Sequence, residues 1–112
     1  MRVSFEEAFA VLKKWENEET PLCVLVSVNG ASFSLSGFIA SLDSSSITVS
    51  HLTESAEKLG EFLIPFYPFS IFGYREVREA TGSIDPRLTS SLQLAGTGME
   101  CIFYELKNKN GD

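Results

Sequence analysis

The dipeptide Asn29-Gly30 constrains this chain more than any other local feature. It follows the β-branched run 22–29 and precedes the run 31–42, which begins with large apolar residues alternating with serines. Asn-Gly favours a two-residue hairpin turn, because both central positions of that turn need a positive φ. The two runs therefore predict a pair of antiparallel strands. Gly37 stands inside the second strand, where a glycine indicates a bend or a bulge.

Residues 4–18 predict a helix in front of this hairpin. Ser4 and Glu7 have the spacing of a capping box, in which each side chain bonds to the backbone N–H of the other residue. The apolar residues share one face of the helix, at positions Phe5, Ala8, Phe9, Leu12 and Trp15. We expect a lid that packs on a sheet, with a partner-binding amphipathic helix as the alternative.

Three further segments predict strands by their apolar and β-branched content: 46–52, 61–77 and 99–106. Pro65 and Pro68 interrupt the second of them, so it is either an edge strand or two strands with a break. Residues 78–97 predict an irregular connection in which a short helix runs from Pro86 to about Leu94, because Asp85-Pro86 resembles a helix start. Residues 107–112 predict a solvated tail.

Length and composition favour one domain over residues 1–112, since the chain has 112 residues of which 44% are hydrophobic and 21% charged. No apolar run reaches the roughly 18 residues that a membrane helix needs. Glu6 and Glu7 stand where a signal peptide would be apolar, so we expect a cytoplasmic protein without a membrane partner. Cys23, Cys101 and His51 are too few and too scattered for a zinc site. We expect two buried free thiols, with a disulfide as the alternative.

Net charge and the absence of catalytic patterns narrow the function. Nine basic and fifteen acidic residues give a net charge of −6, which disfavours RNA as a main ligand because phosphate contacts dominate such binding. The sequence has no glycine-rich phosphate loop and no His-Glu-x-x-His or Gly-x-Ser-x-Gly pattern. We therefore expect no enzyme, no cofactor and no metal.

The segment 26–43 resembles the first motif of the Sm-like (LSm) family, most closely its Hfq type. The positions that carry the resemblance are Asn29, Gly30, Leu35, Gly37, Ile39, Ser41, Leu42 and Asp43. The resemblance implies a mostly β chain with an N-terminal α-helix and a strongly bent, five-stranded antiparallel barrel. It also implies a ring of identical subunits and a surface for RNA or a nucleotide.

Candidate ligand-binding residues are Asp43, Tyr74, Arg75, Arg78 and Arg87. Asp43 favours a turn-capping role through the backbone N–H groups of the serines after it, with ligand contact as the alternative. The arginines near Tyr74 could bind an anion or a phosphate. Because acidic residues are interleaved with them, a surface ion-pair network is the favoured interpretation.

Self-association is the last expectation from the sequence. The predicted free edges are 70–77 and 99–106, and the predicted contact residues are Ile71, Phe72, Tyr74, Ile102 and Tyr104. The chain is then a non-enzymatic Sm-like module that forms a homo-oligomeric ring and presents a binding surface, with RNA possible but disfavoured by charge. The alternative is a structural or protein-interaction module without a nucleic-acid ligand.

Overall fold

The computed structural model describes residues 1–52, 55, 57–76 and 90–106. Within these residues the chain forms one helix and eight strands. In chain order they are β1 (Arg2–Val3), α1 (Phe5–Asn17), β2 (Leu22–Val28), β3 (Ala31–Leu42), β4 (Ser46–Leu52), β5 (Lys58–Pro65), β6 (Phe69–Arg75), β7 (Ser91–Gly96) and β8 (Met99–Glu105).

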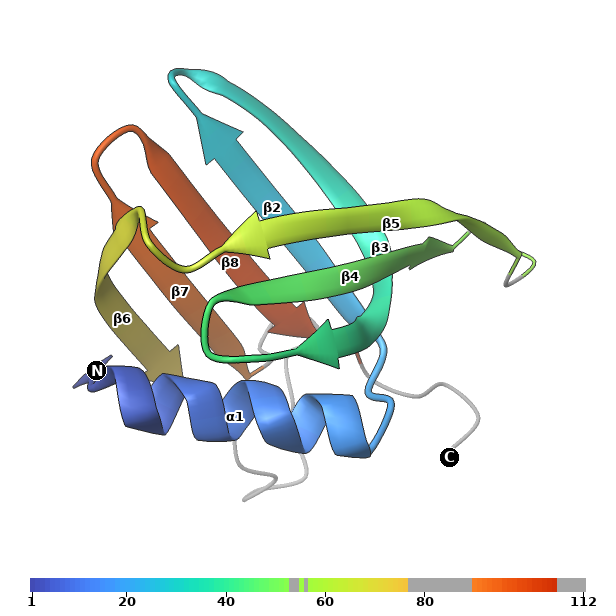
Figure 1. Cartoon of the computed structure of the whole chain (residues 1–112), viewed down its shortest axis with the longest axis horizontal. Helices are drawn as coiled ribbons and strands as arrows, with labels where there is room; N and C mark the ends of the chain where they lie inside the picture. Colours follow the sequence, from blue (N-terminus) through green and yellow to red (C-terminus); the bar gives the residue numbers. More distant parts are fainter. Residues whose placement is uncertain (53–54, 56, 77–89, 107–112) are drawn as a thin grey trace, which may run out of the picture.

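All eight strands belong to one antiparallel sheet in the order β1-β6-β7-β8-β2-β3-β4-β5 (Figure 1). Consecutive strands build two meanders, β2–β5 and β6–β8, and the pairing of β2 with β8 joins them. The sheet is strongly curved but open, because its end strands β1 and β5 do not pair with each other.

The prediction of an Sm-like five-stranded barrel is wrong, although the chain is mostly β with an N-terminal helix. The predicted strand 61–77 is divided at the two prolines into β5 and β6, since proline donates no ladder hydrogen bond. The predicted helix from Pro86 to about Leu94 is also wrong over its last residues, which form the start of β7, while residues 86–89 lie outside the described part. With β1 included, the sheet has three strands more than predicted.

The predicted hairpin turn is confirmed. Asn29 and Gly30 have φ angles of 49° and 90°, as a two-residue turn between right-twisted strands requires. The backbone N–H of Asn29 donates to the carbonyl oxygen of Gly98, 2.9 Å away in the β7–β8 turn. This bond holds the tips of two neighbouring hairpins together.

Helix α1 packs on the inner, concave face of the sheet, so the prediction of a lid is confirmed. Both capping-box hydrogen bonds form, at 3.1 Å from Glu7 N to Ser4 Oγ and at 2.9 Å from Ser4 N to Glu7 Oε1. Trp15 is buried, and its ring centroid lies 6.5 Å from that of Phe103 on β8. The helix lies across one end of the sheet (Figure 1).

The core consists of inner-face side chains from both meanders together with the helix stripe. Its fully buried members include Leu12, Val24, Ile47, Leu94 and Phe103. Backbones also approach closely here. A Cβ atom built on Gly37 of β3 would lie 1.7 Å from the carbonyl oxygen of Ser50 on the paired strand β4, so only glycine fits at this position.

Both cysteines are free, but only one is fully buried. Cys101 points into the core from β8, whereas Cys23 is half-buried on the other face of β2. The prediction of two free thiols is confirmed, and that of two buried thiols holds for Cys101 alone. Among the described residues, no helix has the length and apolar character that crossing a membrane requires.

Candidate functional site

The outer face of the central strands, opposite α1, carries a group of apolar side chains that no helix of the described residues covers. Strand alternation sends Leu22, Val24 and Val26 into the core and their neighbours outward. Leu25 of β2 is paired with Ile102 of β8 in the sheet register, and Ile102 is paired in turn with Gln93 of β7. The row continues one strand further, to Gly73 of β6.

We call four apolar residues of this face the outer apolar patch: Leu25, Ile71, Ile102 and Tyr104. Leu25 is 38% exposed and Ile71 45% exposed, while Ile102 and Tyr104 are half-buried. In the part of the chain that the structure describes, the one helix lies on the opposite face, so none covers this patch. Leu25 and Ile71 therefore face solvent on strands inside the sheet rather than on its end strands.

Polar side chains border the outer apolar patch and also lie between its members. Arg2 and Arg75 lie on the β1–β6 side, and three exposed serines of β3 lie on the other side at 32, 34 and 36. Gln93 donates a side-chain hydrogen bond to the carboxylate of Glu100 on the neighbouring strand. In the sheet register this pair lies between Ile71 and Ile102. A protein-interaction surface usually combines apolar side chains with polar ones in this way.

The predicted contact residues divide between the two faces of the sheet. Ile71, Ile102 and Tyr104 lie on the outer face, but Phe72 and Tyr74 point inward and pack against the core. The ring of Phe72 lies 5.7 Å from that of Phe5 on α1. The predicted free edge 99–106 is wrong, because β8 is hydrogen-bonded to β7 and to β2.

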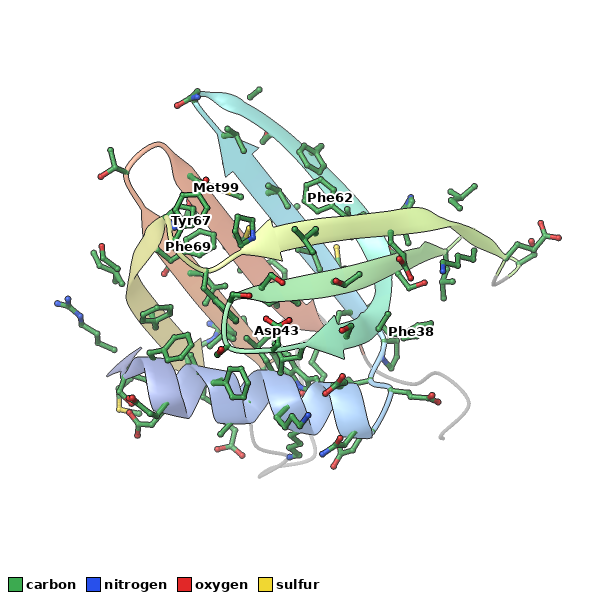
Figure 2. The ribbon with its side chains drawn as sticks, in the orientation of Figure 1. Phe38, Asp43, Phe62, Tyr67, Phe69 and Met99 are labelled. Atoms are coloured by element: carbon green, nitrogen blue, oxygen red, sulfur yellow. The ribbon has the colours of Figure 1, made fainter. Side chains whose placement is uncertain are left out.

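Asp43 lies in the β3–β4 turn (Figure 2) and has the predicted capping role. Its Oδ1 accepts hydrogen bonds from Ser45 Oγ at 2.8 Å, from Ser45 N at 2.8 Å and from Ser46 N at 3.0 Å. These bonds, the one from the Ser45 hydroxyl foremost, lower the pKa of the Asp43 carboxyl below its ordinary value.

The other predicted ligand residues do not form one site with Asp43. Tyr74 is half-buried on the inner face of β6, and Arg75 is exposed at the end of the same strand. Arg78 and Arg87 lie outside the described residues. The prediction that these residues contact a ligand stays a prediction.

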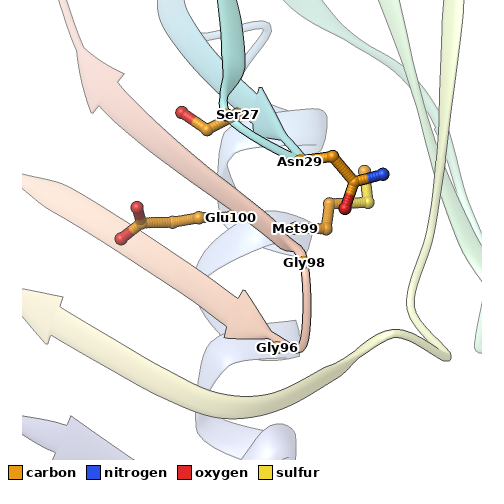
Figure 3. Close-up of a pocket in the computed structure, with 7 residues that line it drawn as sticks. Ser27, Asn29, Gly96, Gly98, Met99 and Glu100 are labelled. Carbon is orange, nitrogen blue, oxygen red and sulfur yellow. The ribbon is translucent and has the colours of Figure 1, made fainter.

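A shallow hollow of about 200 Å³ lies where the two hairpin tips meet (Figure 3). Its lining residues come from the ends of β2, β7 and β8 and from their turns: Ser27, Asn29, Gly30, Gly96, Gly98, Met99 and Glu100. Ligand pockets usually measure about 300 to 1,000 Å³. Glu100 is the one ionisable side chain in this lining, so the hollow presents no acid–base pair.

The reactive side chains in the described residues do not combine into a catalytic group. Burial, and secondarily the charge of Glu100, raises the pKa of the Cys101 thiol to about 12, which is opposite to the shift that activates a nucleophile. His51 Nδ1 lies 3.2 Å from the carbonyl oxygen of Ser36. No cluster of three or more potential metal ligands occurs within residues 1–52, 55, 57–76 and 90–106.

Sequence reasoning missed Leu25, although the sequence contains a signal for it. The run 22–28 is apolar at nearly every position, whereas a strand with one solvated face alternates between apolar and polar residues. A continuous run predicts that both faces of the strand meet apolar surroundings, and on β2 the second face is the outer apolar patch.

Comparison with known proteins identifies no relative: no protein-family model, no curated protein and no solved structure matches the chain. The resemblance to the Sm family gains no support from these comparisons and is contradicted by the open sheet.

Proposed function

We propose that the chain is a non-enzymatic protein-interaction module that binds a protein partner through the outer face of β6, β7, β8 and β2. The outer apolar patch is the observation that carries this proposal. Exposed and half-buried apolar residues on a regular sheet face, together with arginines, serines and the Gln93–Glu100 pair, are typical of a surface that another protein covers.

A protein partner is favoured over RNA by the charges on the outer face. A surface that stacks bases normally combines aromatic rings with a basic groove. Among the described residues, this face offers the ring of Tyr104 and the guanidinium groups of Arg2 and Arg75, with the carboxylate of Glu100 nearby. The net charge of −6 further weakens phosphate binding.

The proposal includes a cytoplasmic location. Cys23 and Cys101 lie on opposite faces of the sheet as free thiols. Free thiols persist most readily in a reducing compartment. A thiol count on protein isolated from its native cell under alkylating conditions tests this part of the proposal.

The experiment compares cross-linked partners of the wild-type chain with those of Leu25→Lys. A lysine in the patch, next to Ile102, would put a charge into the contact, so we expect recovery of the partner to fall more than about tenfold. Ser44→Lys is the matched control, because it adds the same charge in the exposed β3–β4 turn and should keep the partner.

Two results would contradict the proposal. One is equal recovery of the same proteins by the wild type and by Leu25→Lys. The other is micromolar binding of short A-rich or U-rich RNA that weakens steeply with salt, since that would make the ligand a nucleic acid.

A further inference from the structure

Strand β5 ends the sheet, and one of its two edges has no strand beside it within the described residues (Figure 1). The hydrogen bond from Phe66 N to Ser45 O, 2.9 Å long, continues the β4–β5 register by one pair. In an antiparallel ladder, hydrogen-bonded pairs alternate with pairs whose backbone groups point away. The N–H and C=O groups of Ile64 and Phe62 therefore point to β4, and those of Leu63 and Glu61 point to the free edge.

Proline positions agree with this alternation. Pro65 belongs to the set that points away from β4, so its missing N–H removes no hydrogen bond from the ladder. Pro65 blunts one end of the free edge. At the other end, Lys58 forms an ion pair with Glu61 at 2.9 Å. Between these ends, the free edge offers two N–H donors and two C=O acceptors.

Both faces of β5 are apolar next to this free edge. On the outer face, Leu63 is 60% exposed. On the inner face, Phe62 is half-buried (Figure 2) and meets Phe33 of β3, which is 44% exposed, in a T-shaped contact of 5.3 Å. An edge strand with exposed apolar residues and unpaired backbone groups is a template for another strand.

We propose that this edge pairs with β5 of a second copy of the chain, antiparallel about a two-fold axis at Phe62. In this register Glu61 lies opposite the partner's Leu63, and Leu63 lies opposite the partner's Glu61. The two pairs form four backbone hydrogen bonds and use every outward-pointing donor and acceptor of these residues. The two Phe62 side chains meet on the inner face, and each also contacts its own Phe33.

The chain's own residues select this register over its neighbours. An axis at Glu61 would place two carboxylates directly opposite each other, which is unfavourable. An axis at Leu63 would set Glu61 opposite the partner's Pro65, which has no N–H to donate. A shift by a single residue would oppose outward-pointing groups to groups already bonded to β4. The fit of β5 to its own copy at the Phe62 register favours self-pairing over a foreign strand.

A cysteine test reports the register directly. Facing residues of a non-hydrogen-bonded antiparallel pair have Cα atoms about 4.5 Å apart, which is within the range of a disulfide. Under mild oxidation we expect Phe62→Cys to cross-link into a dimer at least tenfold faster than Leu63→Cys. Leu63→Cys is the matched control, because its sulfur atoms would be offset from each other across the axis. Equal rates for the two variants would overturn the register.

A second test concerns the edge itself. Glu61→Pro removes an outward-pointing N–H and leaves the β4–β5 ladder intact, so we expect a folded monomer by circular dichroism and light scattering. The wild type should shift from 12.4 kDa toward twice that mass as its concentration rises. An unchanged wild-type mass, or a dimer of Glu61→Pro, would overturn the proposal. Leu25→Lys should remain dimeric, and a monomer in that case would assign self-association to the outer apolar patch instead.

Discussion

Replacement of Gly37 by alanine tests how closely the paired backbones of β3 and β4 approach each other at this glycine. The added Cβ would lie 1.7 Å from the carbonyl oxygen of Ser50 and 2.8 Å from its carbonyl carbon. Real Cβ atoms essentially never come within 3.0 Å of such atoms, so the two backbones must separate by more than 1 Å. That movement would disturb the pairing of the buried residues Ile39 and Val49, two positions further along the β3–β4 ladder. We expect a loss of about 3 kcal/mol or more in the free energy of unfolding.

Gly60→Ala is the matched control. Gly60 lies on β5, a Cβ there would meet no atom within 4 Å, and its φ is not positive. We expect the free energy of unfolding to stay the same or to rise by up to about 1 kcal/mol, because alanine reduces the freedom of the unfolded chain. Urea unfolding followed by Trp15 fluorescence measures both variants. A loss below about 1 kcal/mol for Gly37→Ala, or an equal loss for the control, would refute the reasoning.

Three other predictions follow from buried or hydrogen-bonded side chains. Trp15→Ala should lower the free energy of unfolding by about 3 to 5 kcal/mol in the same assay, and a loss below about 1 kcal/mol would mean that α1 is not part of the core. Native protein should react with a thiol reagent at Cys23 and should react at Cys101 only on unfolding, because the pKa of the buried Cys101 thiol is raised to about 12; rapid labelling of both thiols in the native protein would contradict this prediction. The same shift means that the free energy of unfolding falls as the pH rises above the ordinary thiol pKa of 9.0. Because the pKa of Asp43 is lowered in the folded state, its carboxylate stabilises the fold at pH values above the ordinary pKa of 3.8, and this contribution disappears as the pH falls through the lower folded-state pKa. An NMR titration that gives the Asp43 carboxyl a pKa of 3.8 or more would contradict this prediction.

Features set by neighbouring residues could be predicted from the sequence. The Ser4–Glu7 capping box, the Asn29-Gly30 turn and the Asp43 cap each depend on atoms within three residues of one another. The backbone can adopt few conformations over so short a stretch, and the residue types at fixed spacings select one of them. The helix stripe was equally predictable, because five apolar residues at helical spacing need a core to cover them.

Strand β7 shows where local reasoning failed. Residues 91–94 alternate polar and apolar side chains, which is a strand pattern, but Asp85-Pro86 suggested a helix that extended over them. A helix start signal says nothing about where the helix ends. In the folded chain, Leu92 and Leu94 are buried against neighbours on β6 and β8, and that gain is available only to a strand.

The identity of the edge strands could not be read from the sequence, since it depends on which strands pair across long stretches of chain. Ile102 and Tyr104 were expected at a free edge and lie instead on the face of a central strand. Both residues are apolar, as the sequence shows, but they belong to a sheet face and not to a strand edge. The same uncertainty hid Leu25, whose partner on the outer face is 77 positions away at Ile102.

The pairing of β2 with β8, which we call the seam because it joins the two meanders, has a consequence for how the chain folds. Each meander contains only hairpins between consecutive strands, which close quickly, whereas the seam joins Leu22 to Glu105 and Val28 to Met99 across most of the chain. Each meander alone would expose one edge of the future seam, together with half of the apolar core. We expect the docking of the two meanders to limit the refolding rate, and the period before docking to be the time when the chain is most prone to aggregate.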